Sequence, residues 1–275
     1  METVDSYDAS LGFRGSAGVA WRDLVAGANM WRIWTVLGWR DFYHQTNRTV
    51  LGPAWSVVGL VIMVGSLGFV YGSLLSTPAR VGYPFTAAGL IAWFFISGCL
   101  QGGFTTFVNS AGTMKERTLP VSFGLYRYTW RLFVEFCLKF SVFAFFAVFS
   151  QFNPGLSLFY LVPVLVLYFC NGLWVNLLFG IIGGRARDMA QLVNPLMLIA
   201  FLATPVLWPS SALGANAFIS TYNPLSHFID IIREPLLGNA PPSGSLVLVF
   251  AVTIMGWSAA FFVFARTRNN IVFWL

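Results

Sequence analysis

Charged side chains are scarce in this sequence: Lys, Arg, Asp and Glu together make up 9% of its 275 residues. A typical soluble domain contains about 25% of these residues. Hydrophobic residues account for 57% of the chain, and its mean hydropathy is +0.72. This balance excludes an ordinary soluble domain and indicates an integral membrane protein.

Catalytic and metal-binding groups are also few. The two histidines, His44 and His227, belong to no recognisable metal or nucleophile motif, and neither Lys115 nor Lys139 ends a G-x-x-x-x-G-K-[ST] loop. We therefore expect no cofactor in this chain and no ATP hydrolysis through such a loop. The three cysteines lie in or near apolar runs without pair spacing, which predicts packing residues rather than disulfides or metal ligands: Cys99, Cys137 and Cys170.

Long uncharged runs, by contrast, are abundant. The run from Thr49 to Ala79 contains no charge, and about 20 apolar residues let a helix cross a bilayer core about 30 Å thick. The runs leave no room for a separate soluble domain, so we predict a single membrane domain over residues 1–275. Its fold class is all-α, with six transmembrane helices at about 51–75, 84–108, 133–151, 156–182, 190–208 and 246–264.

Basic residues are distributed unequally between the segments that connect these runs. With the amino terminus inside, only Arg80 and Arg233 fall outside and Lys139 falls within a span, so both termini are predicted to be cytoplasmic. The net charge of +6 then needs no nucleic-acid partner, because arginines beside an anionic leaflet account for it. The remaining basic residues are Arg14, Arg22, Arg32, Arg40, Arg48, Lys115, Arg117, Arg127, Arg131, Arg185, Arg187, Arg266 and Arg268.

Residues 1–50 form a predicted cytoplasmic segment. They carry charges throughout and have no apolar core with a small-residue cleavage site, so they do not resemble a secretory signal. From Trp21 to Leu37 the chain is rich in tryptophan but too short and polar to span. This stretch predicts an amphipathic helix in the membrane interface, with an ordinary packed helix as the alternative. Its apolar face consists of Trp21, Leu24, Val25, Ala28 and Trp31.

Two connecting segments are longer than a connection requires. Residues 109–131 form a charged cytoplasmic loop, and residues 209–245 form an external region. In the external region, Asn223 and Pro224 predict the start of a helix and Pro235 its end. A helix of about ten residues is too short to cross the membrane, so it lies at the outer surface or re-enters. Its apolar face contains Leu225, Phe228, Ile229, Ile232 and Leu236, with Ser226, Asp230, Arg233 and Glu234 largely opposite.

Glu135 and Lys139 are the clear charged residues inside a predicted span. They are four residues apart with the acid first, and their place near the inner end of the third span favours a structural ion pair over a proton relay. An ion-coupled transporter would need them in its pathway, and an intramembrane enzyme would need a convergent polar set. The 28 Phe, 11 Trp and 9 Tyr mostly suit a lipid-facing surface, although rings lining a conduit would also suit sugars.

Several stretches resemble one family in the same order. "RDFYHQTNRTVLGPAWSV" at residues 40–57 is similar to the entry of the first span in permease subunits of type 2 ABC exporters. Residues 83–131 resemble the second span and the following loop of those that export bacterial polysaccharides. "NLLFGIIGGRARDMAQLVNPLMLIAFLATPVLWP" and "YNPLSHFIDIIREPLLG" match the family's Arg-x-Arg-Asp loop and its external Asn-Pro-Leu-x-His. The likeness covers the chain from about residue 30 onward.

This resemblance implies the permease half of an exporter of O-antigen, or a similar undecaprenyl-diphosphate-linked polysaccharide, in the bacterial inner membrane. Capsular polysaccharide and teichoic acid permeases are close alternatives. It also implies a homodimer with two copies of a separate ATPase subunit, which would hold ATP and Mg. Arg40 and Arg48 are the candidates for contacting the diphosphate. The implied coupling segment is Met114, Lys115, Glu116, Arg117, Thr118 and Leu119, and the implied external gate includes Asn223, Pro224, His227 and Phe228.

Overall fold

The structure, a computed structural model, describes residues 13–44, 52–116, 119–210, 212 and 218–274. Every regular element in these residues is a helix, as predicted. In chain order they are α1 (Phe13–Asn29), α2 (Trp31–His44), α3 (Ala54–Leu74), α4 (Ala79–Gly103), α5 (Thr106–Glu116), α6 (Phe123–Phe149), the 3-10 helix η1 (Gly155–Tyr160), α7 (Leu161–Arg185), α8 (Met189–Ala203), α9 (Phe218–Tyr222), α10 (Pro224–Leu236) and α11 (Ser243–Trp274).

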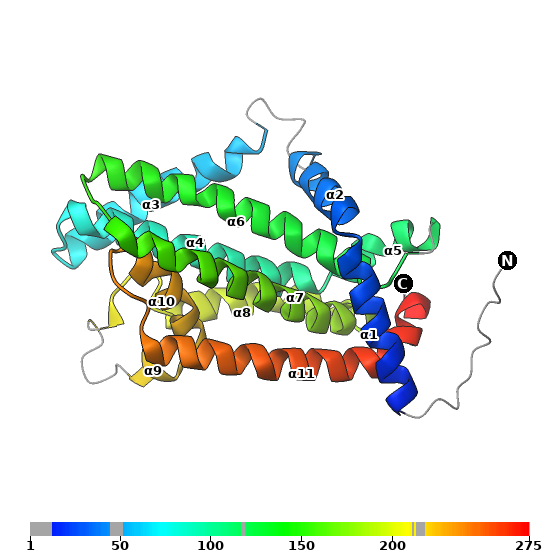
Figure 1. Cartoon of the computed structure of the whole chain (residues 1–275). Helices are drawn as coiled ribbons and strands as arrows, with labels where there is room; N and C mark the ends of the chain where they lie inside the picture. Colours follow the sequence, from blue (N-terminus) through cyan, green and yellow to red (C-terminus); the bar gives the residue numbers. More distant parts are fainter. Residues whose placement is uncertain (1–12, 45–51, 117–118, 211, 213–217, 275) are drawn as a thin grey trace.

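The long helices run side by side, and shorter helices lie at the two ends of this bundle (Figure 1). At one end lie α1, α2, α5 and the carboxyl-terminal part of α11, and α1 packs against α11, where the ring of Trp21 lies 6.4 Å from that of Phe261. At the other end, α9 and α10 lie beside the beginning of α11. We call these the α1 end and the α10 end.

Within the described residues, five helical segments are long and apolar enough to cross a membrane: α3, α4, α6, η1 together with α7, and α11. Each overlaps a predicted span. α3 agrees with the prediction to within a few residues, whereas α4 begins at Ala79 instead of residue 84. α11 continues to Trp274, ten residues beyond the predicted end at 264. The apolar runs therefore located these five segments but not all of their ends.

The predicted span at 190–208 coincides with α8, which has only 15 residues. At a rise of about 1.5 Å per residue, α8 is about 22 Å long, less than the roughly 30 Å hydrocarbon core. The chain leaves the helix at Thr204, where the backbone is extended. Thr204 and the next three residues, up to Leu207, are buried. By length alone, α8 is not a sixth spanning helix.

The predicted loop at 109–131 is mostly helical. α5 extends to Glu116, and α6 begins at Phe123, ten residues before the predicted span. The first turns of α6 carry charge and were therefore not expected to be helical and packed. α2 covers them: the rings of Trp34 and Tyr126 are stacked at 5.8 Å, and Arg127 forms an ion pair with Asp41 of α2.

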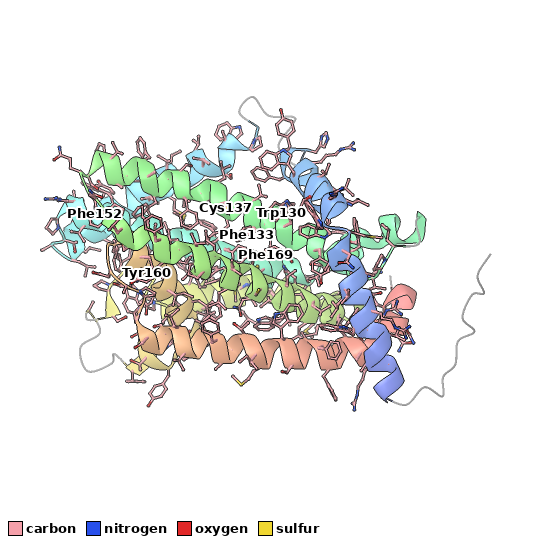
Figure 2. All side chains as sticks on the ribbon, viewed as in Figure 1. Trp130, Phe133, Cys137, Phe152, Tyr160 and Phe169 are labelled. Atoms are coloured by element: carbon pink, nitrogen blue, oxygen red, sulfur yellow. The ribbon has the colours of Figure 1, made fainter. Side chains whose placement is uncertain are left out.

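The centre of the bundle is α4. Within its most apolar stretch 72% of the residues are buried, compared with 17% for α3 and for α11. α4 packs against α3, α6, α7, α8 and α10. Aromatic rings fill the neighbouring seam between α6 and α7, where Phe169 lies 5.2 Å from Phe133 and 6.3 Å from Trp130 (Figure 2). α3 and α11 each bury part of their apolar side chains against the core and leave others exposed, such as Phe69 and Ile254.

The predicted interface helix at Trp21–Leu37 is divided into α1 and α2 at Met30. Its predicted apolar face is also divided. Leu24 is buried against the bundle, whereas Trp21 and Trp31 are 61% and 55% exposed. The buried side of α1 contains a charged residue, Asp23, that the apolar pattern did not include.

Candidate functional site

The Asp23 side chain joins three segments at the α1 end and is 1% exposed. Its carboxylate accepts hydrogen bonds from the backbone N–H groups of Val121 and Ser122, at 3.1 and 2.9 Å. It also accepts a hydrogen bond from Nε of Arg268 on α11 at 2.9 Å and forms an ion pair with this guanidinium, with Nη2 at 2.8 Å. The Ser122 hydroxyl donates back to the Asp23 carbonyl at 2.8 Å. We call these four residues the Asp23 cluster; it links α1, the segment before α6, and α11.

A polar cavity of about 450 Å³ lies between α2, α5 and α6 at the same end of the bundle. Arg127 donates to both carboxylate oxygens of Asp41 at 2.6 Å, and Arg131 lies over the ring of Tyr128 at 4.9 Å. We call it the Arg127 cavity. Its lining is Asp41, His44, Thr106, Asn109, Ser110, Gly124, Arg127, Tyr128 and Arg131.

The predicted diphosphate and coupling residues are close to this cavity along the chain. Arg40 is exposed on α2, next to Asp41 of the cavity lining. Arg48 lies outside the described residues. Of the predicted coupling segment, Met114–Glu116 form the end of α5 and Arg117–Thr118 lie outside the described residues. Leu119 packs against the apolar cluster that includes Phe107 and Phe123.

At the α10 end, the helix predicted from Asn223 and Pro224 is present. The Asn223 side chain accepts from the Leu225 N–H at 2.9 Å, and Pro224 occupies the first turn, as expected for an N-cap. Nδ2 of Asn223 donates to the Thr204 hydroxyl at 2.9 Å, which connects α10 to the chain leaving α8. The helix ends at Leu236, one residue after the predicted end at Pro235.

His227 and Phe228 also connect α10 to its neighbours. The two ring nitrogens of His227 lie 2.9 Å from the Ser245 hydroxyl of α11 and 2.9 Å from the Thr221 carbonyl of α9. The Phe228 carbonyl accepts from the Tyr168 hydroxyl of α7. All four predicted gate residues are therefore brought together where α10 meets the bundle.

The polar face predicted for α10 is wrong in part, because Ser226 and Arg233 are 2% and 3% exposed. Nη2 of Arg233 donates to the carbonyls of Pro205 and Val206 at 2.6 and 2.8 Å. Its guanidinium also lies 4.1 Å from the centre of the Phe85 ring. Burial lowers the pKa of Arg233 to about 10, so it stays protonated at neutral pH. The short helix is thus inserted into the bundle rather than lying on its surface.

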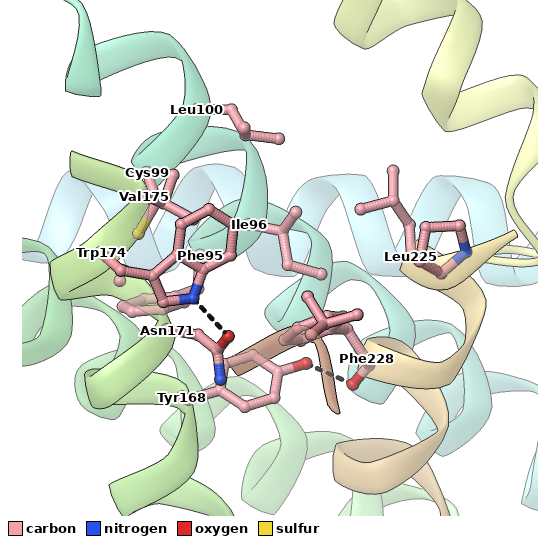
Figure 3. Close-up of a pocket in the computed structure, with 13 residues that line it drawn as sticks. Phe95, Ile96, Cys99, Leu100, Tyr168, Asn171, Trp174, Val175, Leu225 and Phe228 are labelled. Atoms are coloured by element: carbon pink, nitrogen blue, oxygen red, sulfur yellow. Dashed lines mark hydrogen bonds between the residues drawn. The ribbon is translucent and has the colours of Figure 1, made fainter. Parts of the chain in front are cut away.

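A second cavity, of about 200 Å³, lies beside the start of α10, between α4, α7, α10 and α11 (Figure 3). Rings and aliphatic side chains line it, including Phe95, Ile96 and Phe228. Two hydrogen bonds join residues that line it. Nε1 of Trp174 donates to Asn171 at 2.7 Å, and the Tyr168 hydroxyl donates to the Phe228 carbonyl. This apolar lining suits either the packing of neighbouring side chains or the binding of an apolar part of a ligand.

Glu135 and Lys139 form the predicted ion pair, at 2.8 Å. They are the thirteenth and seventeenth of the 27 residues of α6, because this helix begins ten residues before the predicted span. The Lys139 ammonium also lies 4.8 Å from the centre of the Phe94 ring. A groove of about 180 Å³ opens beside the pair, which we call the Lys139 groove. Its lining is Phe94, Phe95, Ser97, Gly98, Gln101, Leu132, Glu135, Phe136 and Lys139.

Sequence reasoning missed Asp23, Arg127 and Arg233 as individually important residues. Their partners are distant in sequence, up to 245 residues away for Asp23 and Arg268. One local signal was present: Asp23 lies beside Leu24 and one turn from Ala20 and Gly27, all of which are buried. An acid among small and apolar residues on one helix face indicates a buried partner.

These features define a multi-pass helical membrane protein with non-spanning helices attached at both ends of its bundle. In the part of the chain that the structure describes, no three His, Cys, Asp or Glu side chains are grouped as a metal site. Residues 32–237 match the model of the ABC-2 type transporter family, and the chain belongs to that family. It is therefore an ABC permease, a transport subunit rather than a catalytic one, and permeases of this family act with ATPase subunits. A search of curated proteins gives no match.

Proposed function

We propose that this permease exports an undecaprenyl-diphosphate-linked polysaccharide such as O-antigen across the bacterial inner membrane. It acts as a homodimer with two copies of an ATPase subunit that holds ATP and Mg. The observation that carries the proposal is the ABC-2 domain over residues 32–237 combined with the stretches at 40–57, 83–131 and 222–238, which resemble polysaccharide permeases. Capsular polysaccharide and teichoic acid are the alternative cargoes.

The diphosphate of the cargo contacts Arg40 and Arg48 at the α1 end. Support for this assignment comes from the exposure of Arg40 on α2 and from the cationic cavity beside it. Guanidinium groups suit diphosphate oxygens because each can donate two parallel hydrogen bonds. Replacing both arginines by Glu should abolish export while leaving the permease in the membrane; unchanged export would overturn this step.

Met114 to Leu119 couple the permease to its ATPase. The α5 helix ends within this segment, and the Asp23 cluster begins two residues after it, at Val121. Movement at the segment would therefore reach α1 and α11 through a short connection. Replacing 114–119 with a Gly-Ser linker of equal length should uncouple ATP hydrolysis from export. Normal coupling in that variant would show that another segment contacts the ATPase.

Asn223, Pro224, His227 and Phe228 form the external gate. The supporting observation is that they hold a short, non-spanning helix against the ends of α7, α8 and α11. To open, α10 would move as a unit, which breaks these polar contacts and separates its buried apolar face from the bundle. Cross-linking α10 to α11 through cysteines at His227 and Ser245 should stop export reversibly; continued export would overturn the gate.

The direct test of the function is purification of the chain with the ATPase encoded beside it, reconstitution in membranes, and assay of ATP hydrolysis with defined lipid-linked glycans. We expect a complex with two copies of each subunit and ATP hydrolysis that responds to O-antigen on undecaprenyl diphosphate. A response only to teichoic acid or capsular polysaccharide would change the cargo. A permease that binds no ATPase would overturn the proposal.

A further inference from the structure

Four charged residues follow one another at intervals of four along α6: Arg127, Arg131, Glu135 and Lys139. Residues spaced by four lie on neighbouring parts of one helix surface. They therefore form a stripe that starts near the α1 end and ascends to the middle of α6. Lys139 lies eight residues beyond Arg131, or about 12 Å along the helix axis.

The lower part of the stripe faces the Arg127 cavity. Two guanidinium groups line it with the amide of Asn109, whereas the hydroxyls of Thr106 and Ser110 in its wall donate to backbone carbonyls. Asp41 holds Arg127 through a bidentate ion pair, which fixes the orientation of that guanidinium. Oriented guanidinium groups with an amide donor beside them are side chains that bind phosphate oxygens.

The upper part of the stripe faces the Lys139 groove, where Ser97 and Gln101 of α4 lie opposite Glu135 and Lys139. The Glu135 side chain keeps 24% of its surface exposed and Gln101 is exposed. Charged groups within a membrane face protein or water rather than acyl chains, because exposure to lipid is costly. The exposed part of Glu135 and the exposed Gln101 therefore favour water over acyl chains at the open side of this groove.

The two openings follow each other along α6, the lower one between α2, α5 and α6 and the upper one between α4 and α6. Arg131 lines the lower one and Leu132, the next residue, lines the upper one. Tyr128 also lines the lower cavity, and its hydroxyl lies 3.5 Å from the carbonyl of Gly98 in the upper groove. The opposite side of α6 is apolar around the exposed thiol of Cys137, which faces a groove lined by Phe140, Phe152 and other apolar side chains (Figure 2).

We propose that the charged stripe of α6 is the wall of a hydrated entry path, and that the Arg127 cavity at its foot binds a phosphate or diphosphate group. Lys139 and Glu135, with Ser97 and Gln101, offer hydrogen bonds to hydroxyls higher in the path. That the phosphate belongs to a lipid-linked glycan rests on the proposed function; the hydration of the path and the anion site do not.

Hydration is tested by thiol labelling of the full-length chain in membrane vesicles that expose the α1 end. The variant is Gln101→Cys, and the reagent is a sulfonated, membrane-impermeant methanethiosulfonate. The native Cys137 is the matched control, because it is exposed on the other side of α6. We expect Cys at 101 to react at least about tenfold faster than Cys137, since only a hydrated thiol ionises readily. Equal rates would overturn the path without bearing on the cargo.

The anion site is tested with Ser110→Cys, a substitution of similar shape in the cavity lining. Inorganic diphosphate should slow its labelling about fivefold, and Arg131→Gln should remove this protection while Arg131→Lys keeps part of it. Absence of protection by diphosphate would overturn the anion site. If Ser110→Cys does not assemble, the same measurement at Asn109→Cys decides the question.

Three probes distinguish the possible sources of the bound phosphate. They are inorganic diphosphate, vesicles containing undecaprenyl diphosphate, and vesicles containing phosphatidylglycerol. Protection by the first two and not the third supports a polyprenyl diphosphate ligand. Protection by inorganic diphosphate alone keeps the anion site and contradicts the lipid-linked cargo. Protection by phosphatidylglycerol equal to that by undecaprenyl diphosphate identifies a general phospholipid site and overturns the entry path for cargo.

Discussion

The two ends of the bundle attach a short helix in opposite ways. At the α1 end a buried carboxylate, Asp23, accepts from two backbone N–H groups and from the Arg268 guanidinium. At the α10 end a buried guanidinium, Arg233, donates to two backbone carbonyls through one nitrogen, Nη2. The first attachment uses both oxygens and a charged partner, and the second uses a single donor atom. Charge-assisted bonds with several partners depend more strongly on the exact side chain.

This contrast predicts that Asp23→Asn will have the largest effect on stability. An amide at this position must turn its NH2 group toward the N–H of Ser122 or toward Arg268, which leaves buried donors unsatisfied. We expect a loss of about 3 kcal/mol, measured by thermal unfolding of the chain in detergent micelles. The control is Arg22→Gln, one residue away and exposed. Equal melting temperatures of Asp23→Asn and the control would break the comparison.

Alanine substitution of one glycine near each end compares how tightly the two ends are packed. A Cβ at Gly89 of α4 would lie 2.3 Å from the Val206 carbonyl oxygen and 2.6 Å from Nη2 of Arg233, whereas one at Gly27 of α1 would lie 2.3 Å from the Ser122 hydroxyl. A backbone carbonyl must shift with its chain, whereas the Ser122 hydroxyl can rotate away by giving up its hydrogen bond to the Asp23 carbonyl. Gly89→Ala should therefore cost about 2 kcal/mol and Gly27→Ala less.

The glycine comparison has a control within α3. Gly59 has open space around the position of a Cβ, so Gly59→Ala should be neutral or slightly stabilising. Thermal unfolding of the three variants gives the ranking. A larger loss for Gly27→Ala than for Gly89→Ala would show that the α1 end is the more tightly packed one.

Arg233→Lys should cost about 1 kcal/mol, less than Asp23→Asn, because one ammonium can replace the single nitrogen that donates to Pro205 and Val206. Arg233→Met removes both hydrogen bonds and should cost about 2 kcal/mol. The exposed Arg80 provides the control variant, Arg80→Lys. If the Lys and Met variants unfold at the same temperature, the two carbonyl contacts do not hold α10.

Among variants that remove a contact, the smallest effect is expected from Asn223→Asp. The Asn223 oxygen accepts from the Leu225 N–H, and its Nδ2 donates to the Thr204 hydroxyl and, at 3.4 Å, to the Ala203 carbonyl. Asn223→Asp keeps the acceptor for the Leu225 N–H and loses the donor to Thr204. A carboxylate at a helix N-terminus is favourable, so the net change should be within about 0.5 kcal/mol. Asn223→Ala loses all of these contacts and should cost about 1–2 kcal/mol. Similar losses in the two variants would assign the stabilisation to the Thr204 contact.

Local patterns predicted the features whose partners are near in sequence. The Asn223 cap acts on Leu225, two residues away, and the Glu135–Lys139 pair spans one helical turn. Both were predicted and both are present. The start of α6 is ten residues earlier than predicted, because its charged first turns have the pattern of a loop. These turns pack because α2 covers them, and a local pattern does not reveal this contact.

The sequence by itself determined that the chain is helical and where five membrane-length segments lie, because apolar length is a property of consecutive residues. It also indicated the family, through motifs that can be read in order. The tertiary structure decided which charged residues are buried and what they contact. Asp23 reaches Arg268 across 245 residues and Arg233 reaches Pro205 across 28. Such contacts depend on how helices pack, and no periodicity along the chain encodes them.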